Sequence, residues 1–180
     1  MQLNIQTPST LKEIQLSQYK AYIKAINKYQ DSDTQLRLKM LEIFCNVPYN
    51  EAIRFKAKDV TRITNRLVKL LEQTPELVTK FEMGDTKFGF IPKLDDMSFG
   101  EYIDLDSSIS DWDIMNMAMA VLYRPIDKEK GKFYTVKDYE GDIYHEAMNS
   151  MPLDAVISSI VFFYRLGNDL SKSMMRYLEE

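Results

Sequence analysis

Acidic side chains gather in the stretch FGFIPKLDDMSFGEYIDLD, and carboxylates at this density raise the question of a calcium site. In the overlapping run DLDSSISDWDIM, Asp104, Asp106 and Ser108 occupy the first, third and fifth positions of a calcium-binding loop. However, Ile109 stands where that loop needs glycine, and Met115 stands where a bidentate glutamate closes it. The spacing therefore excludes an EF-hand and predicts a solvated loop that leads into a helix.

Metal ligands and catalytic nucleophiles of other kinds are scarce. A zinc site needs several histidines or cysteines, and the chain has one of each, Cys45 and His145. A nucleophilic pair of these two would have to be assembled without any local signature, and Cys45 lies at the apolar end of a predicted helix. The Walker, G-x-S-x-G and G-x-G-x-x-G patterns do not occur. We therefore predict a protein that is not an enzyme and that uses no metal or cofactor.

Basic side chains recur along one predicted helix. Lys58, Arg62, Arg66 and Lys69 follow helical spacing and lie opposite a stripe of leucines. Such a face suits the phosphates of a nucleic acid or an acidic protein surface. The alternative is a solvated face without a partner, which is the usual state of exposed charges. No aromatic or glycine-rich pattern for base stacking is interleaved, so nucleic acid is the weaker partner hypothesis.

Acidic residues supply the opposite charge elsewhere in the chain. Asp95, Asp96 and Glu101 are our candidates for the surface that a basic face on a neighbouring copy would contact. Opposite charges on separate segments of one chain suit a head-to-tail contact, which closes into rings when the rotation allows it. We therefore name these three residues, together with the four basic ones, as candidate partner-binding residues.

Arg124 stands between an apolar helix and a proline, so its side chain is expected to be partly buried. A buried charge needs a partner of opposite sign. Glu101, Asp104 and Asp106 lie nearby in the sequence and are our candidates for the partner of Arg124 in a structural ion pair.

The elements that must position these groups can be read from periodicity. We predict a helical unit over residues 1–75 and a second unit over residues 76–180, the two forming one compact domain. In the second unit, LVTKFEMGDTKFGFIP predicts a β-hairpin over 77–91 with Gly84-Asp85 as its turn. This register places Phe81 opposite Phe88 and pairs Glu82 with Lys87 in an ion pair.

Further elements follow the hairpin. KFYTVKDY is the best candidate for a third strand, and SDWDIMNMAMAVLYRP predicts a buried helix that ends after Arg124, because Pro125 stops it. An apolar helix starts at Pro152, and an amphipathic piece over 169–180 ends the chain. The fold class is therefore α+β, mainly α-helical, with a small antiparallel sheet built on the hairpin.

The overall composition excludes several classes of protein. The chain has 180 residues, 45% of them hydrophobic, and a net charge of −4, so nothing draws it globally to nucleic acid or to an anionic membrane. The most apolar run, from Met151 to Gly167, is shorter than the ~20 residues that span a bilayer. The N-terminus lacks a basic and an apolar region typical of a secretory signal. We expect no membrane partner.

Three stretches carry a resemblance: FGFIPKLDDMSFGEYIDLD, WDIMNMAMAVLYRPI and MPLDAVISSIVFFYRLGNDL. Together they resemble a family of small structural proteins of tailed bacteriophages, the crAss-like phages in particular, over residues 75–171. The order of these parts is also similar to tail assembly chaperones. The resemblance rests on aromatic, acidic and Y-R-P landmarks and includes no catalytic motif. The first 70 residues carry no resemblance of this kind.

The resemblance implies a structural or auxiliary virion protein at the capsid or portal vertex, present in several copies of a symmetric assembly. Its partners would be capsid, portal or tail proteins, and it would pass through the host cytoplasm during assembly. The acidic stretch then becomes a connector and a possible docking surface. We expect Phe99, Tyr102, Ile103 and Leu105 to pack inward there, with the acids facing outward or pairing with Arg124.

Overall fold

A computed structural model describes the backbone of residues 5–179 and the side chains of 5–166 and 168. Helices hold 56% of the residues and are combined with one antiparallel sheet in the order β1-β2-β3-β4, which confirms the predicted fold class. The buried apolar side chains form one cluster that extends along the chain from Leu11 to Val156.

The N-terminal part of the chain is helical, as predicted. Its elements are η1 (Leu11–Glu13), α1 (Leu16–Lys28), α2 (Asp33–Cys45), α3 (Tyr49–Ala52) and α4 (Ala57–Leu71). The Ser32 hydroxyl accepts a hydrogen bond from the Gln35 amide at 3.4 Å and so caps α2. Helix α4 presents Leu67 and Leu70 to the core, which is the leucine stripe expected from its sequence.

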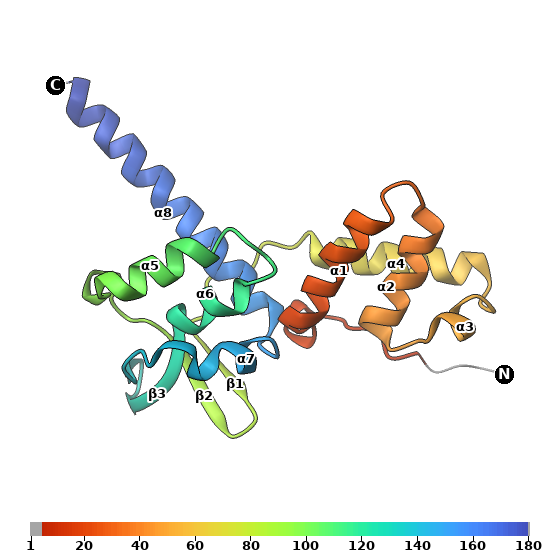
Figure 1. The fold of residues 1–180 in the computed structure, drawn as a ribbon, viewed down its shortest axis with the longest axis horizontal. Coiled ribbons are helices and arrows are strands. Elements are labelled where there is room, and N and C mark those ends of the chain that lie inside the picture. Colours follow the sequence, from red (N-terminus) through yellow and green to blue (C-terminus); the bar gives the residue numbers. More distant parts are fainter. Residues whose placement is uncertain (1–4, 180) are drawn as a thin grey trace.

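The rest of the described chain forms the sheet and four further α-helices, together with two short 3-10 turns. The elements are β1 (Lys80–Met83), β2 (Thr86–Phe90), η2 (Leu94–Asp96), α5 (Phe99–Ser108), α6 (Met115–Leu122), β3 (Tyr123–Lys130), β4 (Phe133–Val136), η3 (Gly141–Tyr144), α7 (His145–Met148) and α8 (Leu153–Glu179). In Figure 1, α1–α4 gather at one end of the molecule, and the sheet with α5–α7 lies at the other. Helix α8 leaves this second end as a long rod that carries the C-terminus.

Backbone hydrogen bonds join the two parts. The amide of Leu16 donates to the carbonyl of Met151 at 3.0 Å, and the amide of Leu153 donates to the carbonyl of Ile14 at 2.8 Å. The start of α1 is thereby fastened to the start of α8. The boundary that we predict at residue 75 falls in the connection between α4 and β1. The amphipathic piece predicted over 169–180 has side chains outside the described residues.

The hairpin has the predicted register. Phe81 lies opposite Phe88, and Gly84 adopts a φ of 54° in the turn, a conformation that favours glycine. Both phenylalanines are buried, and their rings stack with centroids 5.6 Å apart. The predicted ion pair of Glu82 with Lys87 is wrong, although the two residues are cross-strand neighbours. The Lys87 ammonium instead lies 2.5 Å from the carboxylate of Glu129 on β3.

The third strand is not the segment that we predict. KFYTVKDY contributes β4, but β3 lies between it and the hairpin. The helix expected to continue through Arg124 ends at Leu122, because Tyr123 and the two residues after it pair with β2. Pro125 lies opposite Phe88 at the end of this pairing. Its missing backbone N–H therefore disturbs the hydrogen bonds between the two strands least.

The acidic stretch is also different from our prediction. It is not an irregular connector throughout, since its last part, from Phe99 onward, forms α5. The Glu101 amide donates to the Ser98 hydroxyl at 3.3 Å, while the Ser98 amide donates to the Glu101 carboxylate at 2.5 Å. This reciprocal arrangement is a capping box, which satisfies two amides at the start of the helix.

Candidate functional site

An apolar surface lies on the outer side of α5. Phe99 is 77% exposed, Tyr102 is 54% exposed and Ile103 is 51% exposed. The rings of Phe99 and Tyr102 stack with centroids 6.4 Å apart and planes 17° apart. Asp106 follows at the same helical spacing and is also exposed. We call these four residues the α5 surface.

The α5 surface contradicts the packing that we predict for the acidic stretch. Of the four apolar residues expected to point inward, only Leu105 is buried. The inward face of the helix is instead completed by Glu101 and Ser108. Helical spacing puts this buried face opposite Phe99, so burial of one set requires exposure of the other.

Arg124 and Glu101 explain which face of α5 is turned inward. The Arg124 guanidinium makes an ion pair with the Glu101 carboxylate, and their side chains are only 12% and 9% exposed. The same guanidinium donates to the carbonyl of Val121 at 3.1 Å. An ion pair was predicted for Arg124, with Glu101, Asp104 and Asp106 as its candidate partners. The partner is Glu101. Our other prediction for Glu101, an exposed docking residue, is therefore wrong.

The two aspartates predicted for this ion pair have other environments. Asp104 accepts a hydrogen bond from the Tyr139 hydroxyl at 3.0 Å, and the Tyr139 ring lies 5.6 Å from the guanidinium carbon of Arg124. Asp104 thus joins the cluster indirectly, whereas Asp106 faces solvent. Burial, aided by the Asp104 carboxylate, raises the pKa of Tyr139 to about 12. The phenol therefore stays protonated as a donor near neutral pH.

The charge state of Glu101 follows from its neighbours. Burial alone raises the pKa of this carboxyl, but the hydrogen bonds from Ser98 and the charge of Arg124 outweigh that effect. The net result is a pKa below the ordinary value, so Glu101 is ionised at neutral pH. The cluster is consequently a satisfied pair of charges that fixes α5 to β3.

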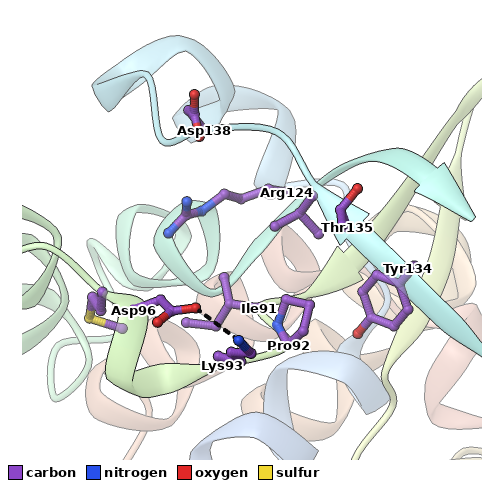
Figure 2. Close-up of a pocket in the computed structure, with 10 residues that line it drawn as sticks. Ile91, Pro92, Lys93, Asp96, Arg124, Tyr134, Thr135 and Asp138 are labelled. Carbon is purple, nitrogen blue, oxygen red and sulfur yellow. Dashed lines mark ion pairs between the residues drawn. The ribbon is translucent and has the colours of Figure 1, made fainter.

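A pocket of about 390 Å³ lies beside this cluster, between the segment after β2 and the strand β4. Arg124 extends along it between Asp138 and the ion pair of Lys93 with Asp96 (Figure 2). Lys93 and Asp96 are 3.7 Å apart, and Arg124 is already paired with Glu101. Both cations of the pocket are therefore neutralised within the chain. This leaves the pocket without a free positive charge to hold an anionic ligand.

The basic face predicted on α4 is present as an exposed surface. Lys58, Arg62, Arg66 and Lys69 are all exposed and lie opposite the buried Leu67. Arg62 is paired with Asp59 of the same helix at 3.1 Å. Within the described side chains, the other three cations have no ion-pair partner. The structure does not bring this face near Asp95 and Asp96, because α4 and η2–α5 lie at opposite ends of the molecule (Figure 1).

Cys45 and His145 are not brought together. They lie on α2 and α7, which are separated in Figure 1. Burial raises the pKa of the Cys45 thiol, and a thiol of this kind is a poor nucleophile. Among the described residues, no group of three or more histidine, cysteine or acidic side chains is arranged to hold a metal ion. The described helices also include none that is long and apolar enough to cross a membrane.

Comparison of the chain with protein-family models, with curated proteins and with solved structures finds no match.

We did not predict from the sequence that Phe99, Tyr102 and Ile103 are exposed and free to make contacts. A signal for the helix that carries them was present, since Ser98 and Glu101 have the spacing of a capping box. Given that helix, Glu101 and Phe99 cannot face the same way. The identity of the buried face depended on Arg124, which is distant in the sequence.

Proposed function

We propose that this chain is a non-enzymatic structural or auxiliary component of a tailed-phage particle, at the capsid or portal vertex. It acts through contacts with other phage structural proteins, in several copies. The resemblance of residues 75–171 supports the phage assignment. The observation that carries the mode of action is the α5 surface, where three large apolar side chains are exposed on consecutive turns of one helix.

Covering the α5 surface with a partner lowers the free energy, because apolar side chains leave water. A single exposed apolar side chain is ordinary, but a cluster of them is typical of interaction sites. Aromatic residues are also enriched in protein interfaces and supply much of their binding energy. Because Glu101 and Arg124 fix α5 to the sheet, the surface is already ordered before binding. Ordering in advance lowers the entropic cost of association.

Mass spectrometry of purified, genome-filled particles tests this function. We expect the chain to be present in a constant ratio to the capsid protein. The Phe99→Ser, Ile103→Ser double variant should be lost from the particles while its melting temperature stays near that of the parent. Phe133→Ser is the matched control, because Phe133 is a strongly exposed aromatic residue on β4, outside the α5 surface. Presence of the double variant in normal amounts would overturn the proposed role of this surface.

A tail assembly chaperone is the alternative that the same experiment separates. A chaperone binds its client during assembly and then leaves, so the chain would be found in infected cells and not in finished particles. That result would replace the virion assignment with the chaperone assignment.

A nucleic-acid-binding packaging accessory is a second candidate. It is favoured by the exposed cations Lys58, Arg62, Arg66 and Lys69 of helix α4, which we call the α4 face. Lys58, Arg66 and Lys69 have no ion-pair partner among the described side chains, as a phosphate-binding surface requires. The net charge of −4 weighs against it. A gel-shift titration at several salt concentrations decides the point, because each phosphate contact adds to the salt dependence of binding. Absence of a shift at low salt would exclude this function.

A further inference from the structure

We propose that copies of this chain associate head to tail, with the α4 face of one copy on the α5 surface of the next. This inference rests on the proposed function and names the first partner of the α5 surface, which is a second copy of the chain.

The charges of the two surfaces are complementary. The α4 face presents Lys58, Arg66 and Lys69, which have no ion-pair partner among the described side chains. The α5 surface includes the exposed Asp106, and the exposed Asp95 precedes the same helix by only a few residues. Opposite charges across an interface steer two surfaces together and set their register.

The apolar part of the α5 surface suits a basic helix as well. Lysine and arginine side chains carry long apolar stems below their charged ends, and these stems cover apolar surface. Their cations also favour the faces of aromatic rings. The stacked rings of Phe99 and Tyr102 therefore suit a row of lysine and arginine side chains.

The arrangement of the molecule requires this contact to be between copies. Helices α4 and α5 lie at opposite ends of the chain (Figure 1), so the two surfaces cannot meet within one molecule. A contact between two different surfaces of identical chains is heterologous. It generates a ring when the rotation closes and a filament when it does not. Either product places several copies in one assembly, as a structural role demands.

Sedimentation velocity of the purified chain over a concentration series tests the contact. We expect species larger than a monomer, with an apparent affinity that falls about tenfold or more when the salt concentration is raised several-fold. The variant Arg66→Glu, Lys69→Glu should be monomeric, since it loses the α4 face. The variant Asp95→Lys, Asp106→Lys should be monomeric as well, since it loses the acidic charges on and beside the α5 surface. Both should keep the melting temperature of the parent, because all four side chains are exposed.

Mixing the two variants gives the sharpest outcome. Each retains the surface that the other lacks, and the reversed charges of one variant complement those of the other, so an equimolar mixture should associate again. A matched control is Lys132→Glu, Lys137→Glu, which carries the same change of net charge on exposed positions around β4 and should associate as the parent does.

Three results would overturn the inference: a parent chain that stays monomeric at every soluble concentration, an Arg66→Glu, Lys69→Glu variant that associates normally, or a mixture that remains monomeric. The second result would indicate contact between two α5 surfaces. The function proposed above fails separately, by absence from particles. A chain that is monomeric alone but present in particles would refute only the head-to-tail contact.

Discussion

The carboxylate of Glu101 on α5 is paired with the guanidinium of Arg124 on β3, and this one contact determines which face of α5 reaches solvent. It joins two residues that are 23 positions apart in the sequence. With Glu101 turned inward, Phe99, on the other side of the helix, must be exposed. The candidate docking surface is thus a consequence of a buried ion pair.

Removal of one partner of this pair should be strongly destabilising. Arg124→Leu leaves the Glu101 carboxylate buried without its counter-ion, and we expect the free energy of unfolding to fall by about 3 kcal/mol. Denaturant melts measure the loss. The control is Arg62→Leu, which removes the exposed ion pair with Asp59 and should cost less than about 1 kcal/mol. Equal effects of the two substitutions would show that Arg124 contributes no more than a surface charge.

The same pair should make stability depend on pH. The pKa of Glu101 is lowered in the folded chain, so its contribution is complete above the unfolded-state pKa of about 4.3 and is lost as the pH falls through the lower folded value. Other carboxylates, such as Glu129, also have a lowered pKa, and the parent alone cannot isolate Glu101. The difference in unfolding free energy between the parent and Glu101→Gln should therefore be largest near neutral pH and shrink in acid. A difference that stays constant with pH would contradict the assignment.

The hairpin should depend on Phe81. Its ring is buried against Phe88 and lies 5.2 Å from the Tyr123 ring, centroid to centroid. Phe81→Ala opens a cavity among these rings, and we expect a loss of ~3–5 kcal/mol in a denaturant melt. Phe133→Ala is the control, because that ring is exposed. A loss below about 1 kcal/mol for Phe81→Ala would be incompatible with this packing.

Gly89 should not tolerate a side chain. A Cβ at this position would lie 2.5 Å from Cε2 of Tyr134, whose ring crosses the sheet and whose hydroxyl donates to the carbonyl of Phe90 at 2.6 Å. We expect Gly89→Ala to lower the unfolding free energy by about 1–3 kcal/mol through overpacking. The penalty should be smaller in a Tyr134→Ala background, since the ring that causes the clash is gone. An equal penalty in both backgrounds would place the strain elsewhere.

The sequence by itself determined the elements whose signals are local. Helical periodicity predicted the helical unit over residues 1–75, and the Gly84 turn with alternating side chains set the hairpin register that places Phe81 opposite Phe88. The exposed cations of α4 were equally predictable, because a leucine stripe specifies its own opposite face. In each case the residues that decide the structure lie within a few positions of one another.

Tertiary structure decided the features that depend on distant partners. Tyr123 and Arg124 continue an apolar helix in the sequence, yet they join a strand because β2 offers them unpaired hydrogen-bonding groups. Most of the apolar side chains of α5 lie on one face of the helix, and periodicity alone assigns that face to the core. That face is exposed instead, because burying Glu101 against Arg124 satisfies two charges at once. The sequence offered Glu101 as one of three candidate partners, and only the tertiary structure selects it.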